Sequence, residues 1–409
     1  DKNDNIISDG RPSLGFTGNM DTYKPAEGSA TRSDIAITDP DFKYPSLWKS
    51  NIAADYKFGD GWVATVELLY SKDINAIYHD NIGLYRTEQF VNDGGAGNAR
   101  PYYNGYYSDR EGNQKAANHV VMLRNTSKGH SLYTTFQLQK NFVDGILKGL
   151  YLNGSYSFGQ SRGVTDGTSS VATSAWKYRA ALDGNAEEVG YTAGSFDGRL
   201  LLSASYTANW SKYAATSFGL IYQRYRPFRY SYCYNGDANG DSQFSNDLMY
   251  IPANFDEVKD HLLPGDFDSQ EDAWKAMNAF IEQDPYLSKH RGEYAERNGA
   301  VAPFANQLDL SVSHDIKIYQ KNGRSHTLRF SFNIANFLNL LNRNWGVVQT
   351  TVLGNQQYQF LTIPKGQGPS AANNYTLKYT MAKDLDETFK DNLNDVSRWQ
   401  MQFGIKYIF

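Results

Sequence analysis

Residues 399–409 alternate between two kinds of side chain, and this alternation restricts the fold more than any other feature of the chain. One set is apolar with aromatic residues at both ends: Trp399, Met401, Phe403, Ile405, Tyr407 and Phe409. The intervening residues are small or polar, apart from Ile408. A period of two is that of a β-strand. One such strand could line a soluble sandwich, but an apolar face with terminal aromatics opposite a polar face is typical of a lipid-facing strand in an outer-membrane β-barrel.

The same alternation recurs along the chain and predicts a transmembrane antiparallel β-barrel of about eleven strands. The expected strands lie at about 48–58, 62–77, 119–142, 150–158, 200–210, 218–222, 307–318 and 325–334, at the C-terminus, and on both sides of a short connection near 354–356. In strands 307–318 and 325–334 the face opposite the apolar one is entirely polar. A polar face suits a water-filled lumen and not a protein core.

Short and long connections alternate between these strands. Short ones such as 59–61 and 319–324 are expected to be periplasmic turns, and long ones such as 161–198 and 227–306 extracellular loops. Residues 1–47 are expected to form a further extracellular loop region. Eleven is an odd number, whereas closed barrels made of one bacterial chain have an even number of strands. Because open strand edges in lipid are costly, we expect a missing N-terminal barrel and plug segment, or a second chain, to complete the barrel.

Bulk properties exclude other classes. The chain has 409 residues and a formal net charge of −4, which gives no indication of nucleic-acid binding. No run of 18 apolar residues occurs, so membrane-spanning helices are not expected. The single cysteine, Cys233, rules out an intrachain disulfide. The N-terminus carries no signal peptide, so we expect that the signal was removed or that the chain begins within a longer protein.

A cluster of side-chain oxygens in the longest connection predicts a Ca²⁺ site. Its proposed ligands are Asp237, Asn239, Asp241 and Asp247. Oxygen ligands at alternate positions suit Ca²⁺, although Ser242 replaces the usual glycine and Leu248 the usual bidentate glutamate of an EF-hand loop. An Asn/Asp-rich turn stabilised by its own side-chain hydrogen bonds is the alternative.

Five aromatic residues, Tyr225, Phe228, Tyr230, Tyr232 and Tyr234, follow the strand that ends near 222. Two interpretations stay open: an interfacial girdle, or a surface on which a sugar or another ligand stacks.

A helix is expected at 270–282, because Ser269 and Asp272 resemble a capping box before an apolar stripe. The G-x-S-x-G pattern at 159–163 lacks the strand-to-helix context of a nucleophile elbow, and we expect no enzymatic activity.

Several motifs resemble TonB-dependent receptors, in the Oar-like branch related to SusC-like transporters. They are DPDFKY (39–44), SKDINA (71–76), NTSKG (125–129), NGDANGD (235–241), NDLMYIP (246–252), NLLNRNWG (339–346) and the terminal strand. The resemblance covers nearly the whole chain and corresponds to the C-terminal half of such a receptor. It implies 22 strands with an N-terminal plug in the complete protein, and a multi-pass location in the bacterial outer membrane. The partners that it implies are membrane lipid, the TonB–ExbB–ExbD energy complex and a surface lipoprotein.

The function expected from this resemblance is nutrient uptake by a TonB-dependent receptor. Extracellular loops would capture the ligand, and energy from the inner membrane would displace the plug. The alternative is a surface protein that transports nothing, such as an adhesin or a structural subunit of a membrane assembly.

Overall fold

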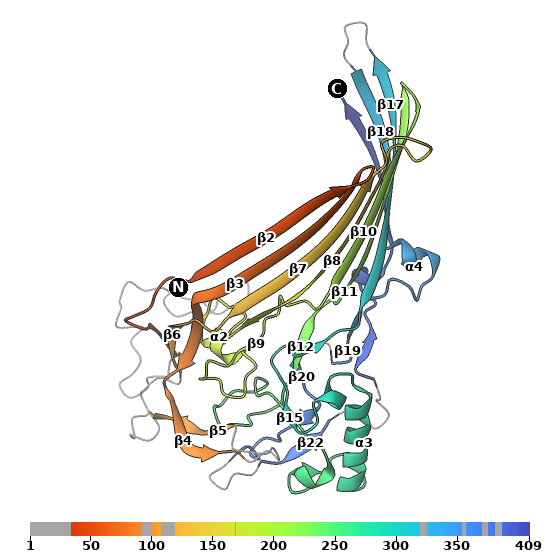
Figure 1. Ribbon diagram of the computed structural model, residues 1–409. Coiled ribbons are helices and arrows are strands. Elements are labelled where there is room, and N and C mark those ends of the chain that lie inside the picture. Colours follow the sequence, from red (N-terminus) through yellow and green to blue (C-terminus); the bar gives the residue numbers. More distant parts are fainter. Residues whose placement is uncertain are drawn as a thin grey trace, which may run out of the picture.

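A computed structural model shows a large curved sheet with a region of loops and short strands at one end (Figure 1). It describes residues 34–91, 100–107, 119–167, 169–319, 325–353, 357–369, 375–380 and 387–409. The described part is mainly β-structure with few helices, which confirms the all-β class. No helix in these ranges is long and apolar enough to cross a membrane.

Nine long strands form the main part of the twelve-stranded sheet, and each pairs antiparallel with the one before it. They are β2 (Ser46–Phe58), β3 (Trp62–Asn81), β7 (His130–Asn141), β8 (Leu150–Gly163), β10 (Arg199–Ser211), β11 (Ala214–Tyr225), β17 (Ala305–Tyr319), β18 (Ser325–Ala335) and β24 (Gln400–Ile408). Three short strands complete the sheet: β1 (Ile35–Thr38), β6 (Val120–Thr126) and β9 (Gly190–Tyr191). Among the described residues, β2 and β24 lie at opposite edges and do not pair, so the sheet is open.

The two faces of this sheet differ as the alternation predicts. Large apolar side chains on one face stay exposed, among them Phe330 at 41%, Phe403 at 81% and Ile405 at 74%. The other face carries hydrogen bonds between side chains of neighbouring strands, such as the 2.7 Å bond that the Gln137 amide donates to Asn153. Exposed apolar groups on one face and paired polar groups on the other are what a wall between lipid and water requires.

The expected long strand at 119–142 is interrupted. It consists of β6 and β7, separated by residues 127–129. Both strands pair with β3, and the register does not change, because Thr126 lies opposite Ala76 and His130 opposite Lys72. A side chain at Gly129 would overlap the Asp73 carboxylate, with its Cβ only 1.8 Å from Oδ2. Glycine therefore allows the close approach at the interruption.

Of the roughly eleven expected strands, the two placed on either side of 354–356 are wrong, because the described residues of that region do not join the large sheet. β18 pairs directly with β24, and the chain between them forms short elements elsewhere. Of these, β20 (Gln357–Tyr358) pairs in parallel with β12 (Arg229–Tyr232) in the loop region. Tyr358 and Phe360 are fully buried there, so their apolar character reflects a protein core and not contact with lipid.

The remaining elements belong to the long connections. They are β4 (Leu84–Phe90), β5 (Pro101–Tyr106), α2 (Ala172–Lys177), β13 (Tyr250–Ile251), η2 (Phe255–Glu257), β14 (Leu262–Leu263), α3 (Gln270–Gln283), η3 (Leu287–Lys289), β15 (Glu293–Tyr294), β16 (Ala300–Val301), α4 (Phe337–Leu341), β19 (Gln349–Thr351), β21 (Leu361–Thr362), β22 (Leu377–Tyr379), β23 (Phe389–Asp391) and η4 (Asp395–Ser397). Of the region 1–47, residues 34–45 hold β1 and the connection to β2, and residues 1–33 lie outside the described part.

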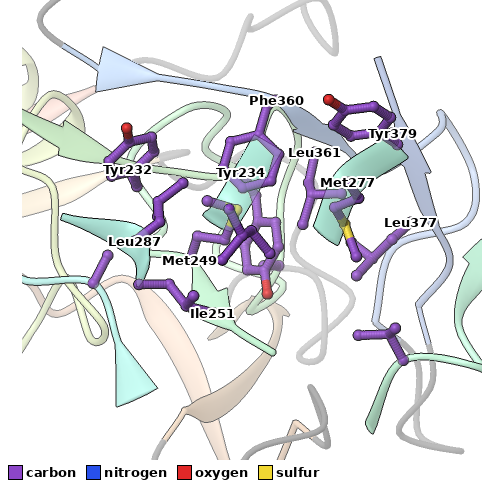
Figure 2. Close-up of a cluster of buried hydrophobic side chains, with 14 of the residues drawn as sticks. Tyr232, Tyr234, Met249, Ile251, Met277, Leu287, Phe360, Leu361, Leu377 and Tyr379 are labelled. Carbon is purple, nitrogen blue, oxygen red and sulfur yellow. The ribbon is translucent and has the colours of Figure 1, made fainter. Parts of the chain in front are cut away.

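The long connections enclose a hydrophobic core of their own, which Figure 2 shows. Helix α3 confirms the expected helix at 270–282, and its N-terminus is capped as predicted, because the Asp272 amide donates a 3.1 Å hydrogen bond to Ser269 Oγ. Met277, Phe280 and Ile281 on its apolar face are buried against Tyr358, Phe360 and their neighbours. Since this face is already covered, it does not form a docking surface.

Candidate functional site

A polar pocket of about 460 Å³ lies where three long connections meet. Its walls come from the connections after β8, after β11 and after β18, which are far apart in the sequence. The residues that line it include Asp166, Tyr178, Arg229, Ser231, Asn298 and Gln359. Carboxylate, hydroxyl, amide and guanidinium groups together can exchange hydrogen bonds with a polar solute.

Strand β12 forms one wall of this pocket with its polar residues. Arg229 and Ser231 line the pocket, whereas the alternate residues Tyr230 and Tyr232 are buried in the core of the loop region. Arg229 donates hydrogen bonds to the backbone oxygens of Ser195 (3.0 Å) and Asn298 (2.9 Å) and pairs with Asp197. Burial lowers the pKa of Arg229, and Asp197 opposes that shift. The guanidinium thus ties three segments together at the pocket wall.

The predicted ligand-stacking role of the aromatic segment is not supported for Tyr230, Tyr232 and Tyr234. All three side chains are at most 1% exposed and pack in the hydrophobic core. The Tyr232 hydroxyl donates a 2.6 Å hydrogen bond to the buried Asp284 carboxylate. These residues are therefore neither an interfacial girdle nor accessible to a ligand.

The other two predicted aromatics lie closer to the sheet. Tyr225 is the last residue of β11 and donates a 3.3 Å hydrogen bond from its hydroxyl to Gln307 on β17. Phe228 is half-buried and packs against the loop core. Phe228 also borders a smaller hollow of about 180 Å³ next to the polar pocket.

Two buried arginines connect the segments behind the pocket. Arg179 and Arg297 both donate to the Val164 carbonyl, and Arg297 also donates to the Gly163 carbonyl. Burial and the neighbouring Arg297 charge lower the pKa of Arg179 to about 10. Burial likewise lowers the pKa of Arg297. Arg297 thus holds the connection before β17 against the connection after β8, whereas Arg179 links residues within the connection after β8.

The predicted oxygen cluster forms a tight loop beside the pocket, and Ser245 of that loop lines the pocket. Asp237 accepts backbone hydrogen bonds from Gly240 (2.6 Å) and Ser242 (2.8 Å), and Asp241 accepts one from Gln243 (2.8 Å). Burial raises the pKa of Asp237, and burial together with the Asp237 charge raises that of Asp241 to about 7. The loop therefore has the side-chain hydrogen bonds of the alternative interpretation.

Asp247 does not take part in a metal site with Asp237 and Asp241, because both of its carboxylate oxygens have other partners. Its Oδ1 accepts a 3.0 Å bond from Arg100 and its Oδ2 a 2.7 Å bond from the Ala238 amide. Burial raises the pKa of Asp247, whereas Arg100 lowers it. In the described part of the chain, no three His, Cys, Asp or Glu side chains are grouped so that they could hold a metal ion. Asp247 is thus the anionic half of a buried ion pair and not the late carboxylate of a metal loop.

Comparisons with protein-family models, with curated proteins and with solved structures find no match for this chain.

Several pocket and loop residues have no signal in the sequence. Arg100 lies 147 positions before Asp247, and Asn298 and Gln357 belong to different connections, so only the fold brings them together. One signal was available: in 229–234 arginine, serine and cysteine alternate with tyrosines. That alternation indicates a strand with two different faces, and it distinguishes the pocket wall from the core.

Proposed function

We propose that this chain is part of the wall and the extracellular loops of an outer-membrane receptor for nutrient uptake. The observation that carries the proposal is the sheet with one exposed apolar face and one hydrogen-bonded polar face. Exposure of large apolar side chains across many strands is unfavourable in water, at roughly 25 cal/mol per Å² of apolar surface. Lipid removes that cost, and the opposite polar face suits a wet lumen.

The loop region supports a role in binding. Loops on rigid scaffolds carry most binding residues, and this loop region has a core of its own that holds the polar pocket in shape. The Asn298 amide donates within the pocket wall, to Asp166 and to the Tyr191 carbonyl, and the carboxylate and amide oxygens that border the pocket can accept hydrogen bonds from a solute. We expect the pocket to be a contact site for the imported ligand, with uptake energised by the TonB–ExbB–ExbD complex as in the receptors that the chain resembles.

The wall proposal is tested with nitroxide spin labels in lipid vesicles. Labels at Leu310, Phe330 and Phe403 should be accessible to oxygen dissolved in lipid and protected from a water-soluble relaxation agent. Matched labels at Ser311 and Ser313, on the other face of β17, should show the opposite preference. Equal accessibility of the two sets to the aqueous agent would refute a lipid-facing wall.

The receptor proposal needs a separate test against the alternative of a surface protein that transports nothing. The complete gene should encode a plug and a TonB box before this region. Replacing the TonB box in such a gene should abolish uptake without changing the amount of protein in the membrane. A complete gene without a plug would favour an adhesin or a structural subunit.

A further inference from the structure

The exposed apolar face of β11 becomes polar and then charged toward the loop region. Phe218, near the middle of the strand, is 41% exposed. Tyr222 follows on the same face, and its hydroxyl donates a 2.9 Å hydrogen bond to Asn306 on β17. Arg224 is exposed and is the last residue of β11 on this face, where it lies opposite Leu200 and Asn306. This order of side chains suits a strand that passes from hydrocarbon into a layer of headgroups.

A second arginine lies beside Arg224 at this end of the sheet. The central guanidinium carbons of Arg224 and Arg226 are 4.6 Å and 4.2 Å from the centre of the Phe304 ring. Arg226 is also fixed by a 2.7 Å hydrogen bond that it donates to the Ala302 carbonyl. Because both guanidinium groups contact one ring, their positive charges lie close together and repel each other.

The described carboxylates balance only part of this charge. Asp197 pairs with both Arg226 and Arg229, and it is the one carboxylate in the described part of the chain that pairs with an arginine of the segment 224–229. Arg224 forms no ion pair with any described residue. Three guanidinium groups therefore share one carboxylate, which leaves an excess of positive charge where the apolar face ends.

We propose that Arg224 and Arg226 bind the phosphate group of an anionic lipid in the leaflet next to the loop region. This inference rests on the lipid-facing wall of the proposed function. A guanidinium group presents its N–H donors in a planar fork that matches phosphate oxygens. The occupant is a lipid and not a soluble anion, because Arg224 continues the face of Phe218 and Tyr222, which acyl chains would cover.

The test uses the full chain in phosphatidylcholine vesicles, with a fluorescent label on Leu202→Cys. Leu202 lies opposite Tyr222 on the apolar face, and the native Cys233 is buried away from the labelling reagent. A nitroxide quencher is carried on the acyl chain of a small fraction of the lipid, either phosphatidic acid or phosphatidylcholine. Phosphatidic acid should give half-maximal quenching at a mole fraction at least ~5-fold lower, since one arginine near a membrane surface contributes about that factor. A label on Phe403→Cys, on β24, should show no such preference.

Substitutions of arginine distinguish this site from a general attraction to positive charge. Arg224→Gln should abolish the preference for phosphatidic acid, and Arg224→Lys should keep part of it, because lysine retains the charge without the planar fork. Arg199→Gln is the matched control. Arg199 is exposed at the same end of β10 but lies opposite Tyr225 on the polar face, so its loss should not change the preference. Circular dichroism checks that each variant keeps its β-structure.

The outcomes separate this inference from the proposed function. Equal quenching by both lipids at the Leu202 position, or an unchanged preference in Arg224→Gln, would overturn the lipid site. Loss of the preference in excess inorganic phosphate at constant ionic strength would also overturn it and assign the arginines to a soluble anion. Absence of quenching by either lipid at both labelled positions would refute the lipid-facing wall itself.

Discussion

The ion pair between Arg100 and Asp247 shows how single residues hold the long connections together. Both side chains are buried, with exposures of 0% and 1%, and Arg100 also donates to the Leu248 carbonyl. Arg100→Met should destabilise the loop region by about 3–5 kcal/mol, because an uncompensated buried carboxylate remains. Urea unfolding followed by tryptophan fluorescence measures this change.

An exposed ion pair provides the control for Arg100. Lys275 and Asp272 are 3.2 Å apart, and the Lys275 side chain is 75% exposed. Lys275→Met should change the free energy of unfolding by only ~0–1 kcal/mol, as solvent screens such pairs. In Arg100→Met/Asp247→Leu the buried charge is removed as well, so part of the lost stability should return. A double variant as unstable as Arg100→Met would contradict this explanation.

His119 makes the loop-region end of the sheet sensitive to pH. Burial lowers its pKa, the Lys177 charge lowers it further, and Asp34 opposes both. The Asn81 amide lies 2.8 Å from Nδ1, an arrangement in which the neutral ring accepts. The folded state favours neutral His119, so its contribution is complete above the unfolded pKa of about 6.5. This stability is lost as the pH falls through the lower pKa of the folded state.

Hydrogen exchange of residues 119–126 between pH 7.5 and 5 tests the role of His119. The wild type should lose protection as the pH falls. His119→Gln keeps an acceptor but does not titrate, so its loss of protection should be smaller. An identical pH dependence in both proteins would assign the effect to groups other than His119.

At the scale of elements, helix α3 depends on its cap. Ser269 Oγ accepts from the Asp272 amide and donates a 2.7 Å bond to the Asp272 carboxylate. Ser269→Ala should cost about 0.5–2 kcal/mol, the usual range for loss of an N-cap. Ser269→Asp can still accept from the amide and should lose less, although its charge lies near Asp272. Protease resistance of α3 in the folded chain reports the difference, and equal resistance of Ser269→Ala and the wild type would show that the cap is unimportant.

At the scale of the whole molecule, the two faces of the sheet differ in character, and the proposed function assigns one to lipid and the other to water. Phe330 lies on the exposed apolar face, and Ser331 points to the other face, near the Gly404 carbonyl. Phe330→Lys should destabilise the protein in lipid vesicles by ~2–4 kcal/mol if the residue lies near the bilayer midplane. Ser331→Lys should cost clearly less, because its charge can reach water in the lumen. If urea unfolding shows the same loss of unfolding free energy for Phe330→Lys and Ser331→Lys, both faces lie in the same environment.

The sequence alone was enough to predict the long strands of the sheet and to tell the apolar face of each strand from its polar face. Strands such as β17, β18 and β24 can be recognised from their own alternation, because neighbouring side chains of a strand point to opposite faces of the sheet. Helix α3 could also be predicted from nearby residues, because the two residues of its N-terminal cap lie within one turn of each other.

The packing of the loop region and the residues that form its pocket could be known only from the tertiary structure. Tyr232, Met277 and Phe360 meet in one core from three distant segments, and their apolar character does not tell a core from a membrane surface. For the same reason, residues near 345–363 seemed to be strands of the wall although they pair within the loop region. Arg100 pairs with Asp247 across 147 positions of the chain, and no local spacing encodes that partnership. Long-range contacts select the partner of each buried polar group, because every buried polar or charged group needs a hydrogen-bonding or oppositely charged partner somewhere in the fold.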